Sequence, residues 1–253
     1  MTNKLSRDFW AISNAQALGS ELATDPARAD LNAEEIKQIT ALLPSLEGKQ
    51  VLELGGGIGR FTGLIAAAAK QVTVLDISPE ALEQNRQKNL SRSNITYCIT
   101  DITQHDLPKE NYDVVFSNWL LMYFDDADTL SLIKRVKQCL RPNGIAFFRE
   151  SCRYNYKAIP AWRYPFSAEV LKAFIPGKHR SIYNVWRLKY SSLGQLLTVI
   201  LGAFKSVHYR ESSEYERLFR SAFSQVQSGF IEVYMKKYKN NQQRYWLLTK
   251  EGH

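Results

Sequence analysis

The clearest candidate for a ligand-binding site in this sequence is a group of three glycines and one acid near position 55. Gly55, Gly57 and Gly59 follow the apolar run 51–54, and Glu53 lies two residues before the first of them. Glycine lets the backbone adopt a positive φ and approach a ligand closely. Apolar residues at helical spacing follow the glycines, so the pattern predicts a buried strand, a tight turn and the start of a helix. The free N–H groups of such a helix start can bind a polar ligand.

Two more acids follow predicted strands further along the chain. Asp76 follows the apolar run 72–75, about 20 residues beyond the glycines. Doubly wound α/β folds that bind nucleotides carry an acid at this distance, and it binds a ribose. Asp101 and its apolar neighbour Ile102 follow a third short strand, 95–98. Ligands of parallel sheets bind beyond the carboxyl ends of the strands. We therefore expect these side chains to share one pocket with the glycine turn.

The glycine spacing separates several kinds of nucleotide site. A P-loop is excluded because no Gly-Lys-Ser/Thr follows the turn. The pattern Glu53-x-Gly55-x-Gly57-x-Gly59 also differs from the dinucleotide fingerprint, whose glycines are spaced differently. Together with the two strand-end acids, this pattern resembles that of the class I S-adenosylmethionine-dependent methyltransferases. The resemblance implies S-adenosyl-L-methionine as the methyl donor, S-adenosyl-L-homocysteine as the product, and no metal ion.

The elements that would position these residues alternate along the chain. Strands are predicted at 112–116 and 145–148, with a helix from about 127 to 140 between them. Two further strands, 230–234 and 244–249, are predicted to pair as a hairpin at the edge of the sheet. We therefore expect an α/β fold, a seven-stranded doubly wound sheet of the Rossmann-like class I methyltransferase type, with a helical insert after strand 5.

Helix starts are indicated by capping residues. One helix is predicted to start at 30–32 with Asn32 as its N-cap, and Glu35 three residues on completes a capping-box pattern. A second is predicted to begin at Ser78, with Pro79 in its first turn. A third is predicted at 213–219.

The length of the chain, its cysteines and its first residues limit the number of domains and the compartment that can be expected. A chain of 253 residues can bury a full core, and one domain is expected. Cys98, Cys139 and Cys152 have no metal-binding spacing, and an odd number of cysteines favours a reducing compartment. The first residues lack the apolar core of a signal peptide, and we expect a cytoplasmic protein.

The net charge of +8 is concentrated in one segment. Between Arg153 and Phe204 there are eight basic residues and one acid, interleaved with aromatic residues. Such a segment can be a solvated basic face, or it can attract an anionic acceptor or an acidic membrane surface. Nucleic acid is not favoured as a partner because no recognised binding module accompanies the charge.

Several longer stretches resemble one methyltransferase family, the phosphoethanolamine N-methyltransferases, and in particular the first catalytic domain of the plant enzymes. The resemblance covers roughly residues 7–152 and 207–250. Its most specific part is the run Phe-Ser-Asn-Trp-Leu-Leu-Met-Tyr at 116–123. The other matching stretches are 7–10, 42–49, 51–63, 147–152, 208–211 and 234–236.

The resemblance implies a role for each matching residue. Asp76 would bind the ribose, Asp101 and Ile102 the adenine, and Glu53 the amino acid portion of the donor. The full set implied for the donor is Glu53, Gly55, Gly57, Gly59, Arg60, Asp76, Ile77, Asp101, Ile102, Asn118 and Trp119. Tyr123 and His208 are the candidates for accepting the proton of an amine, and Phe9, Trp10, Tyr209, Arg210 and Lys236 are the candidates for binding the acceptor.

The sequence departs from the family at two places. Phe9 stands where relatives have a tyrosine, while Tyr123, where some relatives have a histidine, agrees with the plant domains. The segment 153–206 is longer than its family counterpart, and we expect a mainly helical lid over the acceptor, with a dimer contact or a membrane contact as alternatives. The expected layout is an N-terminal cap or arm (1–46), a donor-binding core (47–152), this insert, and an acceptor-side helix with the C-terminal hairpin (207–253).

The leading functional hypothesis is N-methylation of a small-molecule acceptor, an amine that carries a phosphate being one candidate. An alternative is an O-methyltransferase that acts on a bulkier specialised metabolite or a phosphate ester. A non-catalytic protein that binds a membrane surface through the basic insert is an alternative from a different class.

Overall fold

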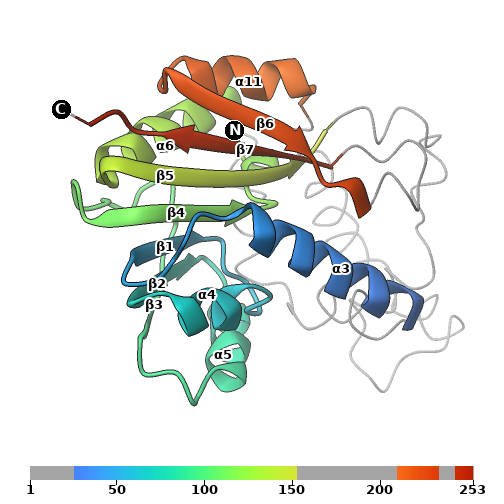
Figure 1. Cartoon of the computed structure of the whole chain (residues 1–253). Helices are drawn as coiled ribbons and strands as arrows, with labels where there is room; N and C mark the ends of the chain where they lie inside the picture. The colour runs from blue at the N-terminus through green and yellow to red at the C-terminus, as the bar shows by residue number, and fades with distance from the viewer. Residues whose placement is uncertain (1–25, 153–209, 234–242, 253) are drawn as a thin grey trace, which may run out of the picture.

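The computed structural model describes residues 26–152, 210–233 and 243–252. One seven-stranded sheet runs through these residues, and helices cover both of its faces (Figure 1). In chain order the elements are α3 (Pro26–Leu42), β1 (Gln50–Leu54), α4 (Thr62–Ala68), β2 (Gln71–Asp76), α5 (Pro79–Lys88), β3 (Ile95–Ile99), β4 (Tyr112–Asn118), the 3-10 helix η1 (Leu121–Tyr123), α6 (Asp126–Cys139), β5 (Leu140–Ser151), α11 (Ser212–Arg220), β6 (Gln225–Phe230) and β7 (Gln243–Thr249).

The strands lie in the order β3-β2-β1-β4-β5-β7-β6. The first five are parallel to one another, and β7 is antiparallel to both β5 and β6. The order reverses at β1, which pairs with β2 on one side and β4 on the other. Ligands of doubly wound sheets bind at such a reversal. The predicted seven-stranded class I methyltransferase architecture is confirmed.

Alternation along the strands divides the core into two layers. Val72 and Val74 point into a layer with α3, α4 and α5, whereas Leu75 points into the opposite layer with α6 and α11. The central strands are apolar on both faces because helices cover both. The buried sheet therefore fixes the strand ends on which the acidic side chains stand.

The cap predicted for α5 is confirmed. The hydroxyl of Ser78 accepts a hydrogen bond from the N–H of Ala81 at 3.2 Å, and Pro79 occupies the first turn. The start predicted for the N-terminal helix is wrong, because α3 begins at Pro26 and Asn32 lies inside it. Proline suits a first helical turn, where its missing N–H costs nothing. Asn32 and Glu35 therefore do not cap this helix, because both lie in its interior.

Two strand boundaries also differ from the prediction. β5 begins at Leu140 rather than 145, and the last residue of α6 leads directly into it. β6 spans Gln225–Phe230 rather than 230–234. Among the described strands it lies at the edge of the sheet and pairs with β7 alone, so a polar sequence suffices for it, and the apolar run at 230–234 is a misleading signal. The predicted edge pairing with β7 is nevertheless present.

In the part of the chain that the structure describes, no helix is long and apolar enough to span a bilayer. The part of the predicted N-terminal cap or arm before position 26, and the insert 153–206 that was predicted to form a lid, lie outside the described residues.

Candidate active site

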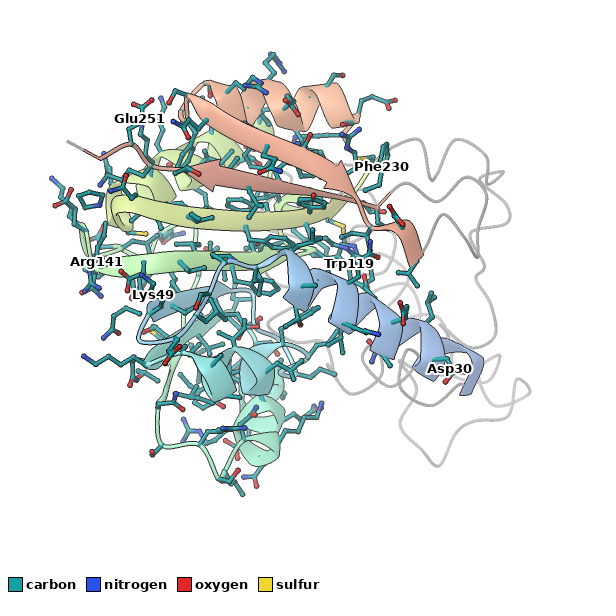
Figure 2. The ribbon with its side chains drawn as sticks, in the orientation of Figure 1. Asp30, Lys49, Trp119, Arg141, Phe230 and Glu251 are labelled. Atoms are coloured by element: carbon teal, nitrogen blue, oxygen red, sulfur yellow. The ribbon has the colours of Figure 1, made fainter. Side chains whose placement is uncertain are left out.

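A cavity of about 620 Å³ lies beyond the carboxyl ends of β1, β2 and β4. Trp119 marks this end of the sheet in Figure 2, and Arg141 and Lys49 mark the opposite end. Every residue that the sequence assigned to the donor lines this cavity, and Tyr123 does so as well. The sequence did not point to Asn32 and Ile36, through which α3 forms part of the wall, or to Lys88 and Leu120.

The glycine turn brings backbone close to the cavity. Gly57 has a φ of +50°, and a Cβ built on it would meet no atom within 4 Å, so the turn is open there. At Gly56 a Cβ would lie 2.2 Å from a methyl carbon of Val74, so the turn packs tightly against β2. The turn therefore offers an open backbone surface to a ligand while its other side is fixed to the sheet.

Asp76 connects the end of β2 to this turn. One carboxylate oxygen accepts the N–H of Gly57 at 2.8 Å, and the other accepts the N–H of Ser78 at 2.9 Å. Burial raises the pKa of Asp76, and these backbone hydrogen bonds oppose the rise. A carboxylate has about four lone-pair sites, so Asp76 keeps acceptor capacity for hydroxyl groups of a ligand in the cavity.

Glu53 lies at the end of β1 and is 3% exposed. It accepts the hydroxyl hydrogen of Thr62 at 2.6 Å. Burial raises the pKa of Glu53 to about 8, the Thr62 hydrogen bond lowers it, and the nearby charge of Asp76 raises it further. A cationic ligand would favour the ionised form of this carboxyl group.

Asn85 is a residue that the sequence did not single out. Its amide group donates to the hydroxyl of Thr62 at 2.8 Å and to the carbonyl of Gly57 at 3.3 Å. This side chain is fully buried, and it ties α5 to the glycine turn. An asparagine on the inner face of a helix gives no local sequence signal of such a role.

Asp101 and Ile102 lie in the cavity wall after β3. The carboxylate of Asp101 accepts the N–H of Thr103 at 2.9 Å and its hydroxyl hydrogen at 2.7 Å, and these bonds fix its orientation. Ile102 is 7% exposed and offers an apolar surface next to it. A carboxylate beside an apolar surface can bind the edge and the face of an aromatic base.

Trp119 follows β4 and is held from several sides. Its φ is +58°, and its N–H bonds the carbonyl oxygen of Arg149 at 2.8 Å. The indole N–H donates to Gln243 at 3.1 Å, and the guanidinium carbon of Arg149 lies 3.8 Å from the ring centroid. Asn118, the preceding residue, also lines the cavity.

A buried carboxylate, Glu35, connects α3 to this wall. It accepts hydrogen bonds from the guanidinium groups of Arg60 and Arg149, and its side chain is fully buried. Arg60 also donates to Asn32 at 2.6 Å. The capping role that the sequence suggested for Glu35 is therefore wrong, because this side chain forms a buried ion pair with both arginines.

Arg210 has partners other than the phosphate group that the sequence suggested. It is 3% exposed, and it donates to the carboxylate of Asp126 at 2.8 Å and to the carbonyl oxygens of Leu121 at 3.0 Å and Phe124 at 2.8 Å. Arg210 does not line the cavity. Its bonds to the carbonyl oxygens of Leu121 and Phe124 hold the loop that carries Tyr123. The other acceptor-side and catalytic candidates, Phe9, Trp10, His208, Tyr209 and Lys236, lie outside the described residues.

Comparison with known proteins agrees with this geometry. Residues 51–144 match the methyltransferase domain family. Over 255 residues the chain is 31% identical to a phosphoethanolamine N-methyltransferase of Triticum aestivum, and the match covers 96% of this chain and 42% of that protein. The chain thus spans less than half the length of this relative. The predicted resemblance to class I methyltransferases and to phosphoethanolamine N-methyltransferases is confirmed.

Two solved structures share the fold. One is Haemonchus contortus phosphoethanolamine N-methyltransferase 1 in complex with phosphoethanolamine and S-adenosylhomocysteine, with a TM-score of 0.67, 23% identity, and coverage of 100% of this chain and 50% of that one. The other is an S-adenosylmethionine-dependent methyltransferase of Leishmania major, with a TM-score of 0.65, 20% identity, and coverage of 98% and 83%.

Proposed function

We propose that this chain is an S-adenosylmethionine-dependent N-methyltransferase whose acceptor is a small amine that carries a phosphate. The observation that carries the proposal is the row of acids Glu53, Asp76 and Asp101 in one cavity beside an open glycine turn. The similarity to the wheat phosphoethanolamine N-methyltransferase supports the choice of acceptor.

The charge of the cavity wall fits the methyl donor. S-adenosylmethionine carries a sulfonium and an ammonium group, and Glu53 has a pKa raised to about 8 by burial, so a nearby cation would favour its ionised form. Asp76 keeps acceptor capacity for ribose hydroxyls after its two backbone bonds. Asp101 and Ile102 provide a polar and an apolar contact for adenine.

The bound donor would supply an electrophilic methyl group with a neutral thioether as the leaving group. The task of the chain is then to hold the amine nitrogen in line with that methyl group, because orientation is the main source of rate in such a displacement. Trp119 and Tyr123 lie in the part of the wall that leaves β4, and we assign them to the side of the cavity where donor and acceptor meet.

The amine must be neutral when it attacks, and free alkyl amines have pKa values near that of lysine, about 10.4. A proton must therefore leave the nitrogen for a basic side chain or for water, and Tyr123 is our candidate within the described residues for accepting a hydrogen bond from the amine as it does so. His208 remains a second candidate for the proton, and Phe9, Trp10, Tyr209 and Lys236 remain candidates for contacts to the acceptor and its phosphate.

Binding and turnover test the proposal separately. Isothermal calorimetry should detect binding of both S-adenosylmethionine and S-adenosylhomocysteine, and failure to bind either would exclude the class. An acceptor panel of phosphoethanolamine, simple amines and hydroxylated metabolites should then give methylation on nitrogen. Methylation of hydroxyl groups alone would instead favour an O-methyltransferase.

A further inference from the structure

The loop at 119–124 forms one wall of the cavity. Trp119, Leu120, Tyr123 and Phe124 all line it. The loop leaves β4 through Trp119, whose φ of +58° is unfavourable for a residue with a side chain. Such a conformation persists only where the surrounding structure holds it. The question is therefore which groups hold this loop.

Glu150 holds the start of the loop. One of its carboxylate oxygens accepts the N–H of Leu120 at 2.9 Å and the N–H of Leu121 at 2.8 Å. Glu150 is fully buried and lies on β5, where its backbone is in register with that of Arg244 on β7. It therefore acts from a rigid position in the sheet, and its carboxylate serves as the N-terminal cap of η1.

Arg210 holds the end of the loop. Its guanidinium group donates to the carbonyl oxygens of Leu121 and Phe124, and to Asp126 at the start of α6. Glu150 accepts hydrogen bonds from N–H groups of the loop, and Arg210 donates hydrogen bonds to its carbonyl oxygens. The two side chains therefore bond complementary backbone groups of the same short segment. Hydrogen bonds with a charged partner are about twice as strong as neutral ones.

We propose that Glu150 and Arg210 are positioning residues that together fix the 119–124 loop, and with it Tyr123 and Trp119, in the orientation that methyl transfer requires. Neither side chain lines the cavity, so neither contacts the ligands directly. The kinetic part of this inference rests on the proposed function, and the part on the loop does not.

Hydrogen exchange tests the hold on the loop without any substrate. The amides of Leu120 and Leu121 should exchange slowly in the wild type and at least about tenfold faster in Glu150→Leu, which removes the acceptor but keeps similar volume. Glu150→Gln keeps a carbonyl oxygen at the same place and should stay within about threefold of the wild type. Glu83→Gln, an exposed glutamate on α5, is the matched control and should change neither amide.

A second variant covers the case in which Glu150→Leu does not fold. Glu150→Asp keeps the carboxyl group but is shorter by one methylene group, so it cannot bond both N–H groups in the same place, and it should also speed exchange at Leu120 and Leu121. Unchanged exchange at both amides in the folded variants, with the core strands still protected, would overturn the proposal.

Kinetics then test the consequence for catalysis. Glu150→Leu should lower kcat at least about tenfold while the Kd for S-adenosylhomocysteine changes by less than about threefold, and Glu150→Gln should restore most of kcat. Arg210→Lys should behave like Glu150→Leu, because one ammonium group cannot replace a guanidinium fork bonded to three oxygens. Equal kcat in all variants would contradict the positioning role. A wild type that binds S-adenosylhomocysteine but methylates no amine would contradict the proposed function instead, and the exchange data would still decide the role of Glu150.

Discussion

The guanidinium group of Arg149 lies over the ring of Trp119, with 3.8 Å from its central carbon to the ring centroid. The same two residues are also joined through their backbones, because the N–H of Trp119 donates a hydrogen bond to the carbonyl oxygen of Arg149. On its other side Arg149 pairs with the buried carboxylate of Glu35. One arginine at the end of β5 thus joins helix α3 to the wall of the cavity.

Replacing Arg149 should lower the free energy of unfolding. Arg149→Leu leaves Glu35 buried with Arg60 as its remaining described arginine partner, and breaking a buried ion pair typically costs about 3–5 kcal/mol. Arg141→Leu on the same strand is the matched control, because Arg141 is 41% exposed, and its pairing with Asp113 should contribute less than about 1 kcal/mol. Urea unfolding measures both. Equal losses in the two variants would show that the buried pair has no special weight.

Loss of the Asp76 carboxylate should weaken donor binding. Asp76→Ala removes an ionised acceptor that also bonds the N–H of Gly57, and each hydrogen bond to a charged group contributes about 1.5–3 kcal/mol. Calorimetry with S-adenosylhomocysteine should therefore show a Kd raised at least about tenfold. Asp106→Ala, which changes an exposed acid in the loop between β3 and β4, should leave the Kd unchanged. Unaltered affinity in Asp76→Ala would remove Asp76 from the donor site.

The two central glycines should respond differently to alanine. Gly56→Ala places a methyl group 2.2 Å from Val74, so the turn or the valine must shift and donor binding should fall. Gly57→Ala meets no atom within 4 Å, and its cost should be limited to the positive φ, about 1 kcal/mol. Thermal unfolding and calorimetry on both variants check the order. A larger stability loss in Gly57→Ala would contradict the packing described for the turn.

Stability should fall as the pH rises from about 4.5 towards 8. Burial raises the pKa of Glu53 to about 8 and that of Glu150 to about 7, both from an ordinary value of 4.5. Over this range the folded state binds more protons than the unfolded state, so unfolding becomes easier as the pH rises, and the stabilisation is fully present only below about 4.5. Glu53→Gln should flatten this dependence in urea titrations. A slope that is the same in Glu53→Gln and the wild type would show that Glu53 is not its source.

The sequence predicted the parts of the site that have local patterns. Glu53 and Asp76 stand at the ends of apolar runs, and the capping of α5 by Ser78 follows from three adjacent residues. Such signals survive in the sequence because strand ends, turns and caps are decided by near neighbours. For the same reason the sheet could be predicted with its strand-end acids in one pocket.

The rest depends on contacts between residues far apart in the chain. Glu35 and Arg149 are separated by 114 positions, and nothing near either residue shows the pairing. The pattern around Glu35 instead suggested a helix cap. Arg210 matched a phosphate-binding position in sequence, but the structure satisfies its guanidinium group with Asp126 and two carbonyl oxygens. Charged side chains in a core are paired only by the tertiary fold, so local reasoning misassigned Glu35 and did not anticipate the partners of Arg210.

The most direct test of the proposed function is transfer of an isotopically labelled methyl group from S-adenosylmethionine, followed by mass spectrometry and NMR of the product. With phosphoethanolamine as the acceptor, the label should appear on its nitrogen. Ethanolamine without the phosphate should react more slowly, and Asp76→Ala should lose most of the activity. Donor binding with no label on the nitrogen of phosphoethanolamine or of any amine offered would contradict the proposed function.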